Sequence, residues 1–138
     1  MYKGAKPLSE DNDSRQEAVE VGKQKDISEA AKEIGLLIPV FMTASVWDEW
    51  VTPDQKSMEQ GEDQKSRLIV VLHKLLYFLR VHRQENRSNL IYFPVSLNKG
   101  GESKDIQLLS HLGPLEVGED KPCITIMSPE EYEDNKVN

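Results

Sequence analysis

Cysteine and long apolar runs are scarce in this chain. The 138 residues include one cysteine, Cys123, so no disulfide can form within the chain. Basic residues interrupt the most apolar segment, and its unbroken apolar runs are shorter than a membrane span requires. No apolar segment typical of a secretory signal follows the first residues. We therefore expect a cytoplasmic protein that has no membrane-spanning segment.

Positive charge is also in the minority. The 17 Lys and Arg residues face 24 Asp and Glu, which gives a net charge of −7. This balance argues against a general nucleic-acid binder or a protein of anionic membranes, since both need positive surface. The excess is uneven: residues 61–99 carry +4, whereas residues 1–60 and 100–138 carry −5 and −6. The acidic segments would suit a basic partner, or solubility alone.

Sequence patterns of catalysis and of metal or phosphate binding are missing. The three histidines and Cys123 have no spacing typical of a zinc site, and neither H-E-x-x-H nor C-x-x-C occurs. Ser110 and His111 would face opposite sides of a strand, and no G-x-S-x-G is present. Gly100-Gly101 lacks the context of a P-loop. The sequence therefore predicts no catalytic residue, no metal and no cofactor, and we expect the protein not to be an enzyme.

The most apolar segment is residues 65–83, KSRLIVVLHKLLYFLRVHR. Apolar residues recur at helical spacing, and only a narrow polar stripe remains. That stripe consists of Arg67, Lys74 and Arg80, with His73 beside Lys74. The pattern predicts a core helix that is covered on most sides.

Shorter segments precede this helix. Ser14 and Glu17 have capping-box spacing, and Asp26 and Glu29 repeat it, so each pair predicts the start of a short helix. Thr43 is a predicted N-cap for a third helix, which brings Trp47 and Trp50 to one face. In chain order we expect a helix to Gly22, a polar link at 23–26, a helix at 27–34, a strand at 36–42, a helix at 44–51 and a loop at 52–64.

Three strands follow the core helix. Residues 89–97, 105–112 and 122–127 are joined by short polar connections, which predicts an antiparallel meander. Ser128 and Pro129 could start a last helical turn. The predicted fold is α+β: a small antiparallel sheet, with the meander plus one earlier strand, packed on a long central helix with short N-terminal helices. We expect a mobile tail at 1–13, one domain at 14–132 and a frayed acidic end at 133–138.

Several phrases of the chain resemble one family. They include Arg15 to Gly22, Asp26 to Glu29 with Ala31, Gly35 with Ile38-Pro39-Val40, Thr43 with Val46-Trp47, Asp63 to Leu72, and Pro122 to Met127 with Pro129. In these residues the chain resembles small proteins carried by bacterial plasmids, phages and other mobile elements, a family known as a domain of unknown function. The resemblance implies an accessory protein of a mobile element and no particular activity. Lys23-Gln24-Lys25 depart from the family, whose members are apolar there, and this weakens any expectation of a strand.

One group of residues predicts a protein-binding surface. Trp47, Asp48, Glu49 and Trp50 lie together on the helix predicted after Thr43. An exposed tryptophan is a common anchor at protein interfaces, and neighbouring acids attract a basic surface. We therefore expect a non-enzymatic protein that binds and modulates a partner protein with a basic surface.

A second group supports an alternative function. Lys74, Arg80, Arg83 and Arg87 are followed by Tyr92, an aromatic residue on which a base could stack. Cations near a helix C-terminus are also favoured by the helix dipole alone. The alternative is a nucleic-acid-binding accessory protein that uses the basic end of the core helix.

Overall fold

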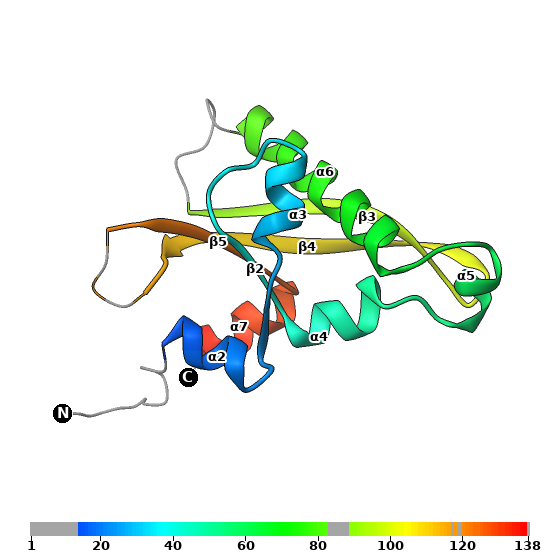
Figure 1. Ribbon diagram of the computed structural model, residues 1–138, viewed down its shortest axis with the longest axis horizontal. Helices are drawn as coiled ribbons and strands as arrows, with labels where there is room; N and C mark the ends of the chain where they lie inside the picture. The colour runs from blue at the N-terminus through cyan, green and yellow to red at the C-terminus, as the bar shows by residue number, and fades with distance from the viewer. Residues whose placement is uncertain (1–13, 83–88, 117, 119, 138) are drawn as a thin grey trace.

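A computed structural model describes residues 14–82, 89–116, 118 and 120–137 of the chain (Figure 1). The predicted tail at 1–13 lies outside these residues. A single sheet forms the middle of the molecule, with helices on both sides of it (Figure 1). No helix among the described residues is long and apolar enough to cross a membrane.

The sheet has five strands in the order β1-β2-β5-β4-β3. Neighbouring strands are antiparallel except β2 and β5, which are parallel. The α+β class is confirmed, and β3, β4 and β5 pair in the order expected of the meander. The expectations of a wholly antiparallel sheet and of a single strand before the long helix were wrong, since β2 and β5 are parallel and two strands precede that helix. The strands are β1 (Gln24–Asp26), β2 (Val40–Thr43), β3 (Leu90–Lys99), β4 (Glu102–Pro114) and β5 (Pro122–Met127).

The segment expected to be a polar link forms strand β1, so that expectation was wrong. β1 pairs with β2 on one side only and forms an edge of the sheet. Lys25 and Asp26 remain exposed there. An edge strand of this kind needs no apolar residues, because its backbone hydrogen bonds are independent of the side chains.

Some helices begin and end where the sequence predicts, and others do not. Ser14 caps α2, since its Oγ accepts from the N–H of Glu17 at 3.0 Å. The expected loop at 52–64 contains a short helix, α5, and the last helix is longer than the single turn expected. The helices are α2 (Arg15–Glu20), α3 (Ser28–Glu33), α4 (Ala44–Val46), the π-helix η1 (Trp47–Val51), α5 (Gln55–Glu59), α6 (Gln64–His82) and α7 (Pro129–Val137).

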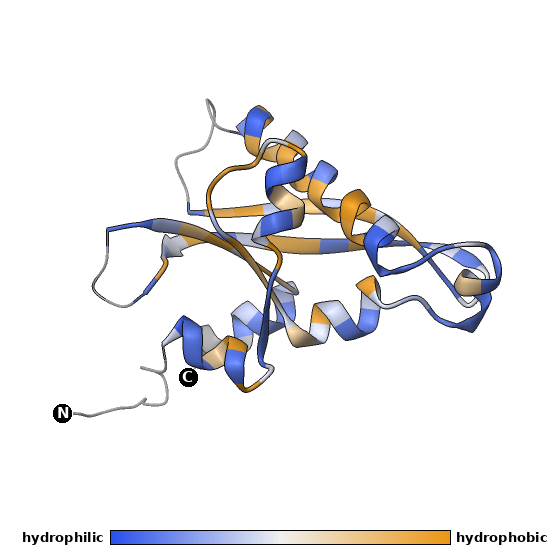
Figure 2. Cartoon of the chain, in the orientation of Figure 1, coloured by the Kyte–Doolittle hydropathy of each residue, from blue (hydrophilic) through white to orange (hydrophobic). Residues whose placement is uncertain are grey.

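Helix α6 covers one face of the sheet and supplies much of the core. Leu68, Val71, Leu72 and Leu75 are buried in one cluster with residues of every strand except β1. Figure 2 shows hydrophobic residues along the sheet and on the helix above it. The prediction of a core helix is confirmed.

The prediction that α6 is covered on most sides was wrong. Val70, Tyr77 and Val81 are exposed on its outer side. Arg67, expected in the polar stripe, is instead buried. The sheet has only one layer, so a helix lying on it can bury one face and leaves the other in water.

The opposite face of the sheet is also covered at its centre. Phe41, Leu109, Cys123 and Thr125 are buried on this face, and helices α2 and α7 lie on its side (Figure 1). Strand β5 is therefore buried on both faces, which explains why four consecutive residues of it are inaccessible.

Candidate functional site

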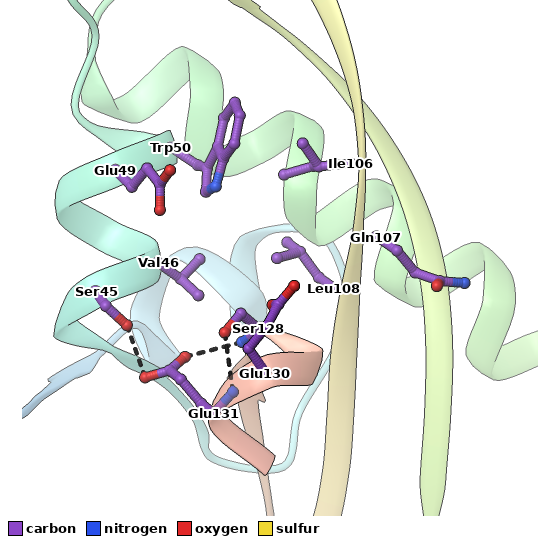
Figure 3. A pocket seen from close by; sticks show the side chains of 10 residues that line it. All are labelled: Ser45, Val46, Glu49, Trp50, Ile106, Gln107, Leu108, Ser128, Glu130 and Glu131. Atoms are coloured by element: carbon purple, nitrogen blue, oxygen red, sulfur yellow. Dashed lines mark hydrogen bonds between the residues drawn. The ribbon is translucent and has the colours of Figure 1, made fainter. Parts of the chain in front are cut away.

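A pocket lies where β2 and β5 end. There the chain passes from β2 into α4 and η1, and from β5 into α7, beside strand β4 (Figure 3). The pocket has a volume of about 620 Å³, within the range of ligand sites. It is lined by Ser45, Val46, Glu49, Trp50, Ile106, Gln107, Leu108, Ser128, Glu130 and Glu131.

One wall of the pocket is apolar and comes from two segments. Val46 and Trp50 project from α4 and η1, and Ile106 and Leu108 from β4 (Figure 3). The Lys99 ammonium lies 4.4 Å from the centre of the Trp50 ring and 3.5 Å from Glu49 Oε2. The Lys99 contacts therefore hold the indole of Trp50 and the carboxylate of Glu49 next to each other at the pocket.

The other wall is acidic. Ser128 and Glu131 form a capping box at the start of α7: Ser128 N–H donates to Glu131 Oε1 at 2.9 Å, and Glu131 N–H donates to Ser128 Oγ at 3.2 Å. Thr43 and Ser45 also donate to the Glu131 carboxylate, at 2.9 and 2.6 Å. Glu131 is thus fixed in place, while Glu130 is exposed. Among the described residues neither has an ion pair, so this wall stays negatively charged.

The structure divides the four predicted partner-binding residues. Trp47 and Trp50 are both half-buried and both pack against the hydrophobic core, but only Trp50, together with Glu49, also lines the pocket. The Lys25 ammonium lies 5.9 Å from the centre of the Trp47 ring. Asp48 is exposed and does not line the pocket. Residues 47–51 form a π-helix, in which Thr52 N–H donates to Trp47 O at 2.8 Å. Because a π-helical turn holds more residues than an α-helical turn, side chains three apart are displaced further around the helix axis.

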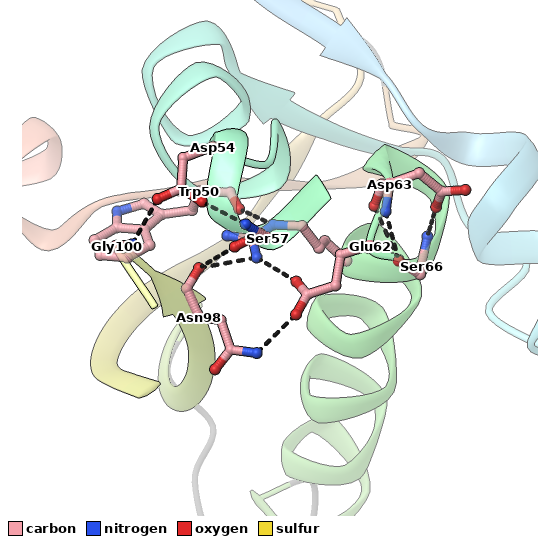
Figure 4. Close-up of polar contacts among 9 residues, drawn as sticks. Trp50, Asp54, Ser57, Glu62, Asp63, Ser66, Asn98 and Gly100 are labelled. Atoms are coloured by element: carbon pink, nitrogen blue, oxygen red, sulfur yellow. Dashed lines mark hydrogen bonds and ion pairs between the residues drawn. The ribbon is translucent and has the colours of Figure 1, made fainter. Parts of the chain in front are cut away.

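A polar network supports η1 from the other side (Figure 4). Arg67 is buried, and its Nε donates to the carbonyl of Trp50 at 2.8 Å. Its Nη1 donates to Glu62 Oε1 at 2.6 Å and to Asn98 O at 3.0 Å. Arg67 therefore ties η1, the start of α6 and the end of β3 together, which sets the position of Trp50.

Asp54 anchors the tip of the β3–β4 hairpin to the same region. Its carboxylate accepts from the N–H of Ser57 at 2.9 Å and from the N–H of Gly100 at 2.5 Å (Figure 4). The hydrogen bonds from these two backbone N–H groups, of which the one from Gly100 has the larger effect, lower the pKa of Asp54 from 3.8 to about 2. Gly100 has a φ of +64°, a conformation in which a residue with a side chain would be strained.

Arg15 organises the far face of the sheet, a role that no sequence pattern predicted. Its Nη1 donates to Thr125 Oγ1 at 2.9 Å and to Gln24 Oε1 at 2.8 Å, and its guanidinium lies 4.8 Å from the Phe41 ring centre. Nε donates to the carbonyl of Leu115 at 2.9 Å. A residue at the first turn of a helix gives no clue that its side chain will reach the sheet.

The residues with possible catalytic chemistry, Ser110, His111 and Cys123, lie on the neighbouring strands β4 and β5. Burial raises the pKa of the Cys123 thiol, and burial also lowers the pKa of His111. Ser110 is paired with Ile126 on the core side, while the ring of His111 on the other face lies 6.3 Å from that of Tyr132. Within the described part of the chain, no three His, Cys, Asp or Glu residues are grouped to hold a metal ion.

The residues of the nucleic-acid alternative are only partly placed. Lys74 and Arg80 are exposed on α6, and Arg83 and Arg87 lie outside the described residues. Tyr92 is exposed on β3, next to Phe93, which is buried in the cluster beneath α6. Because neighbouring strand residues face opposite sides, Tyr92 lies on the other face of the sheet from α6. The structure therefore does not bring Tyr92 together with Lys74 and Arg80.

Neither protein-family models, nor curated proteins, nor solved structures gave a match to this chain.

Proposed function

We propose that this protein is a non-enzymatic binding protein that docks on a partner protein with a basic surface. The observation that carries the proposal is the half-buried Trp50 in the wall of a pocket lined by three glutamates, of which Glu49 is paired with Lys99 and Glu130 and Glu131 have no ion pair among the described residues. Tryptophan is enriched among the residues that dominate binding energy at interfaces. Acidic neighbours speed the encounter with a basic partner and help to select it.

Two further observations support a binding role over catalysis. The thiol of Cys123 is buried, and burial raises its pKa, which opposes thiolate formation. The pocket lining offers hydroxyls and carboxylates but no histidine, lysine or cysteine. An accessory role in a mobile element is what the sequence resemblance implies, and it stays a prediction.

Affinity capture from a bacterial extract, with and without nuclease, tests this function. Wild type, Trp50→Ala and Tyr77→Ala would be compared as tagged proteins. Tyr77 is a matched control, because it is an exposed aromatic residue on α6, away from the pocket. We expect wild type and Tyr77→Ala to capture partner proteins whether or not nuclease is added, and Trp50→Ala to lose them. High salt should weaken the capture by wild type. Neutralising one acid, as in Glu130→Gln, should have a smaller effect.

Charge reversal of Arg80 or Arg83 tests the nucleic-acid alternative in the same experiment. If Arg80→Glu or Arg83→Glu abolished capture while Trp50→Ala had no effect, the basic surface that contains the substituted arginine would be the binding surface. Loss of the captured material on nuclease treatment, with steep salt dependence, would point the same way.

A further inference from the structure

Part of strand β4 has an open edge. Strand β5 ends at Met127, which pairs with Leu109 of β4. Strand β4 extends beyond this pair, because it begins at Glu102. Among the described strands, residues 102–108 of β4 pair only with β3. The β4–β5 register would place Pro129 opposite Gln107 if it continued, but Pro129 begins α7 and has no N–H to donate.

Two backbone hydrogen bonds show which way β4 directs its polar groups. The N–H of Leu112 donates to Asn89 O on the β3 side at 2.9 Å, and the N–H of Leu115 donates to Lys121 O on the β5 side at 2.7 Å. In an antiparallel ladder the two directions alternate along the strand. Even-numbered residues therefore bond to β3, and Ser103, Asp105 and Gln107 direct their N–H and C=O groups to the open side.

The outer edge of β3 is protected at two positions, Pro94 and Asn98. The same alternation turns the backbones of Pro94 and Asn98 toward the outside of the sheet. Pro94 has no N–H, and the carbonyl of Asn98 accepts from Arg67 at 3.0 Å and from Ser57 at 3.3 Å. Proline and covered carbonyls are usual defences of an edge strand. Neither protects residues 103–107.

The 620 Å³ pocket borders one end of this open edge. Ile106, Gln107 and Leu108 all line it, although consecutive side chains of a strand point to opposite faces. What the three residues share is the edge of the strand. Val46 and Trp50 stand across the pocket from them, and Glu130 lies at its α7 end (Figure 3).

We infer that β4 binds an extended, basic segment of the partner protein, which adds to the sheet as a strand beside Ser103, Asp105 and Gln107. The inference rests on the proposed function and specifies how the partner binds. Backbone hydrogen bonds supply affinity in this mode, and alternate side chains supply specificity. An apolar side chain of the segment packs against Trp50, and a Lys or Arg meets Glu130. A second copy of this acidic chain would bring like charges together at the same edge.

The probe is a displayed library of random peptides of about ten residues, enough to span the open edge at about 3.3 Å per residue. Peptides selected on wild type are expected to alternate apolar residues with Lys or Arg. Their Kd is then measured by fluorescence anisotropy with wild type, Gln107→Pro and Gln107→Ala. Gln107→Pro removes the outward N–H without removing a β3–β4 hydrogen bond, and Gln107→Ala keeps that N–H.

We expect Gln107→Pro to weaken binding about tenfold or more, the equivalent of about 1.4 kcal/mol, and Gln107→Ala to change it less than about twofold. Thermal melting shows whether the proline variant folds. Backbone N-methylation of the peptide, with binding measured to wild-type protein, gives an independent measurement. Methylation of the alternate amides that face β4 should abolish binding, and methylation of the amides that face away from β4 should be tolerated. Equal tolerance at every position would overturn strand addition.

The outcomes separate this inference from the proposed function. If selected peptides need Trp50 but are unaffected by Gln107→Pro and by N-methylation, the binding function stands and strand addition is wrong. If no peptide is selected while capture still depends on Trp50, strand addition is also wrong. Slow amide exchange at Asp105 and Gln107 in the free protein would show the edge already occupied, by another segment or a second copy, and would overturn the inference.

Discussion

Arg67 is the residue whose position differs most from what its type suggests. A basic residue on an expected solvent stripe instead has a side chain only 3% exposed. It is buried because it satisfies the carbonyls of Trp50 and Asn98 as well as the carboxylate of Glu62. A planar guanidinium can reach several acceptors at once, which is a reason for arginine rather than lysine at this position.

Replacing Arg67 should therefore be costly. We expect Arg67→Ala to lower the free energy of unfolding by about 2–4 kcal/mol, because it leaves buried carbonyls and the Glu62 carboxylate without their donor. Lys32→Ala removes an exposed pair with Glu29 and should change stability by about 0–0.5 kcal/mol. Chemical denaturation of both variants checks this. Equal stability losses would show that the Arg67 network adds nothing beyond a surface ion pair.

Asp54 gives a prediction about pH. Its pKa is lowered to about 2 by the N–H groups of Gly100 and Ser57, so the folded state favours the ionised carboxylate. A lowered pKa contributes stability above the ordinary value of 3.8, and this contribution is lost as the pH falls toward about 2. Wild type should therefore exceed Asp54→Asn in stability at neutral pH, and the difference should narrow across that interval. Urea unfolding at several pH values would measure it, and a constant difference would contradict the assignment.

At the scale of elements, α6 shows how a helix with apolar residues on most sides can still lie on a surface. One side is buried against the sheet, and the other presents Val70, Tyr77 and Val81 to solvent. Residues on the two sides of the same helix should therefore differ sharply in their contribution to stability.

Leu75→Ala should cost about 2–5 kcal/mol, since this side chain is fully buried and its removal leaves a cavity. Tyr77→Ala is the matched control, because Tyr77 is 59% exposed two residues away. Its cost should stay below about 1 kcal/mol, in the range of surface and propensity effects. Thermal and chemical unfolding of both variants provide the comparison. A melting temperature of Leu75→Ala within a degree of wild type would contradict the burial of Leu75 on the core side of α6.

For the molecule as a whole, the parallel pairing of β2 with β5 joins the first part of the chain to the last. Val40, Phe41 and Met42 pair with Ile124, Thr125 and Ile126 in the middle of the sheet. Val40, Met42, Ile124 and Ile126 also belong to the cluster that α6 covers. No part of this core can be separated from the rest without breaking the sheet.

The protein should therefore unfold in one cooperative transition. Tryptophan fluorescence reports on Trp47 and Trp50, and far-ultraviolet circular dichroism reports on the backbone of the whole chain. The two midpoints should coincide in urea. Two separated transitions would show that the N-terminal elements and the meander are independent units.

The sequence by itself determined the elements whose signals are local. Ser14 caps α2, a hydroxyl-and-carboxylate pair caps α7, and the alternation of residues 122–127 matches strand β5. Helix α6 follows from its period, and the α+β class follows from the order of elements. These signals are readable because they depend on backbone geometry and on residues a few positions apart.

Only the tertiary structure decided which residues meet. Trp47 and Trp50 both pack against the core, as a shared helix face predicts, but only Trp50 also reaches the pocket, whose walls come from strand β4 and helix α7 far along the chain. Strand β1 forms because β2 offers it an edge, and the positions of the half-buried Arg15 and the buried Arg67 depend on acceptors far along the chain. The open edge of β4 exists because β5 is shorter than β4. Pairing and strand length are settled by contacts between distant segments, and such contacts leave no periodic signal in the sequence.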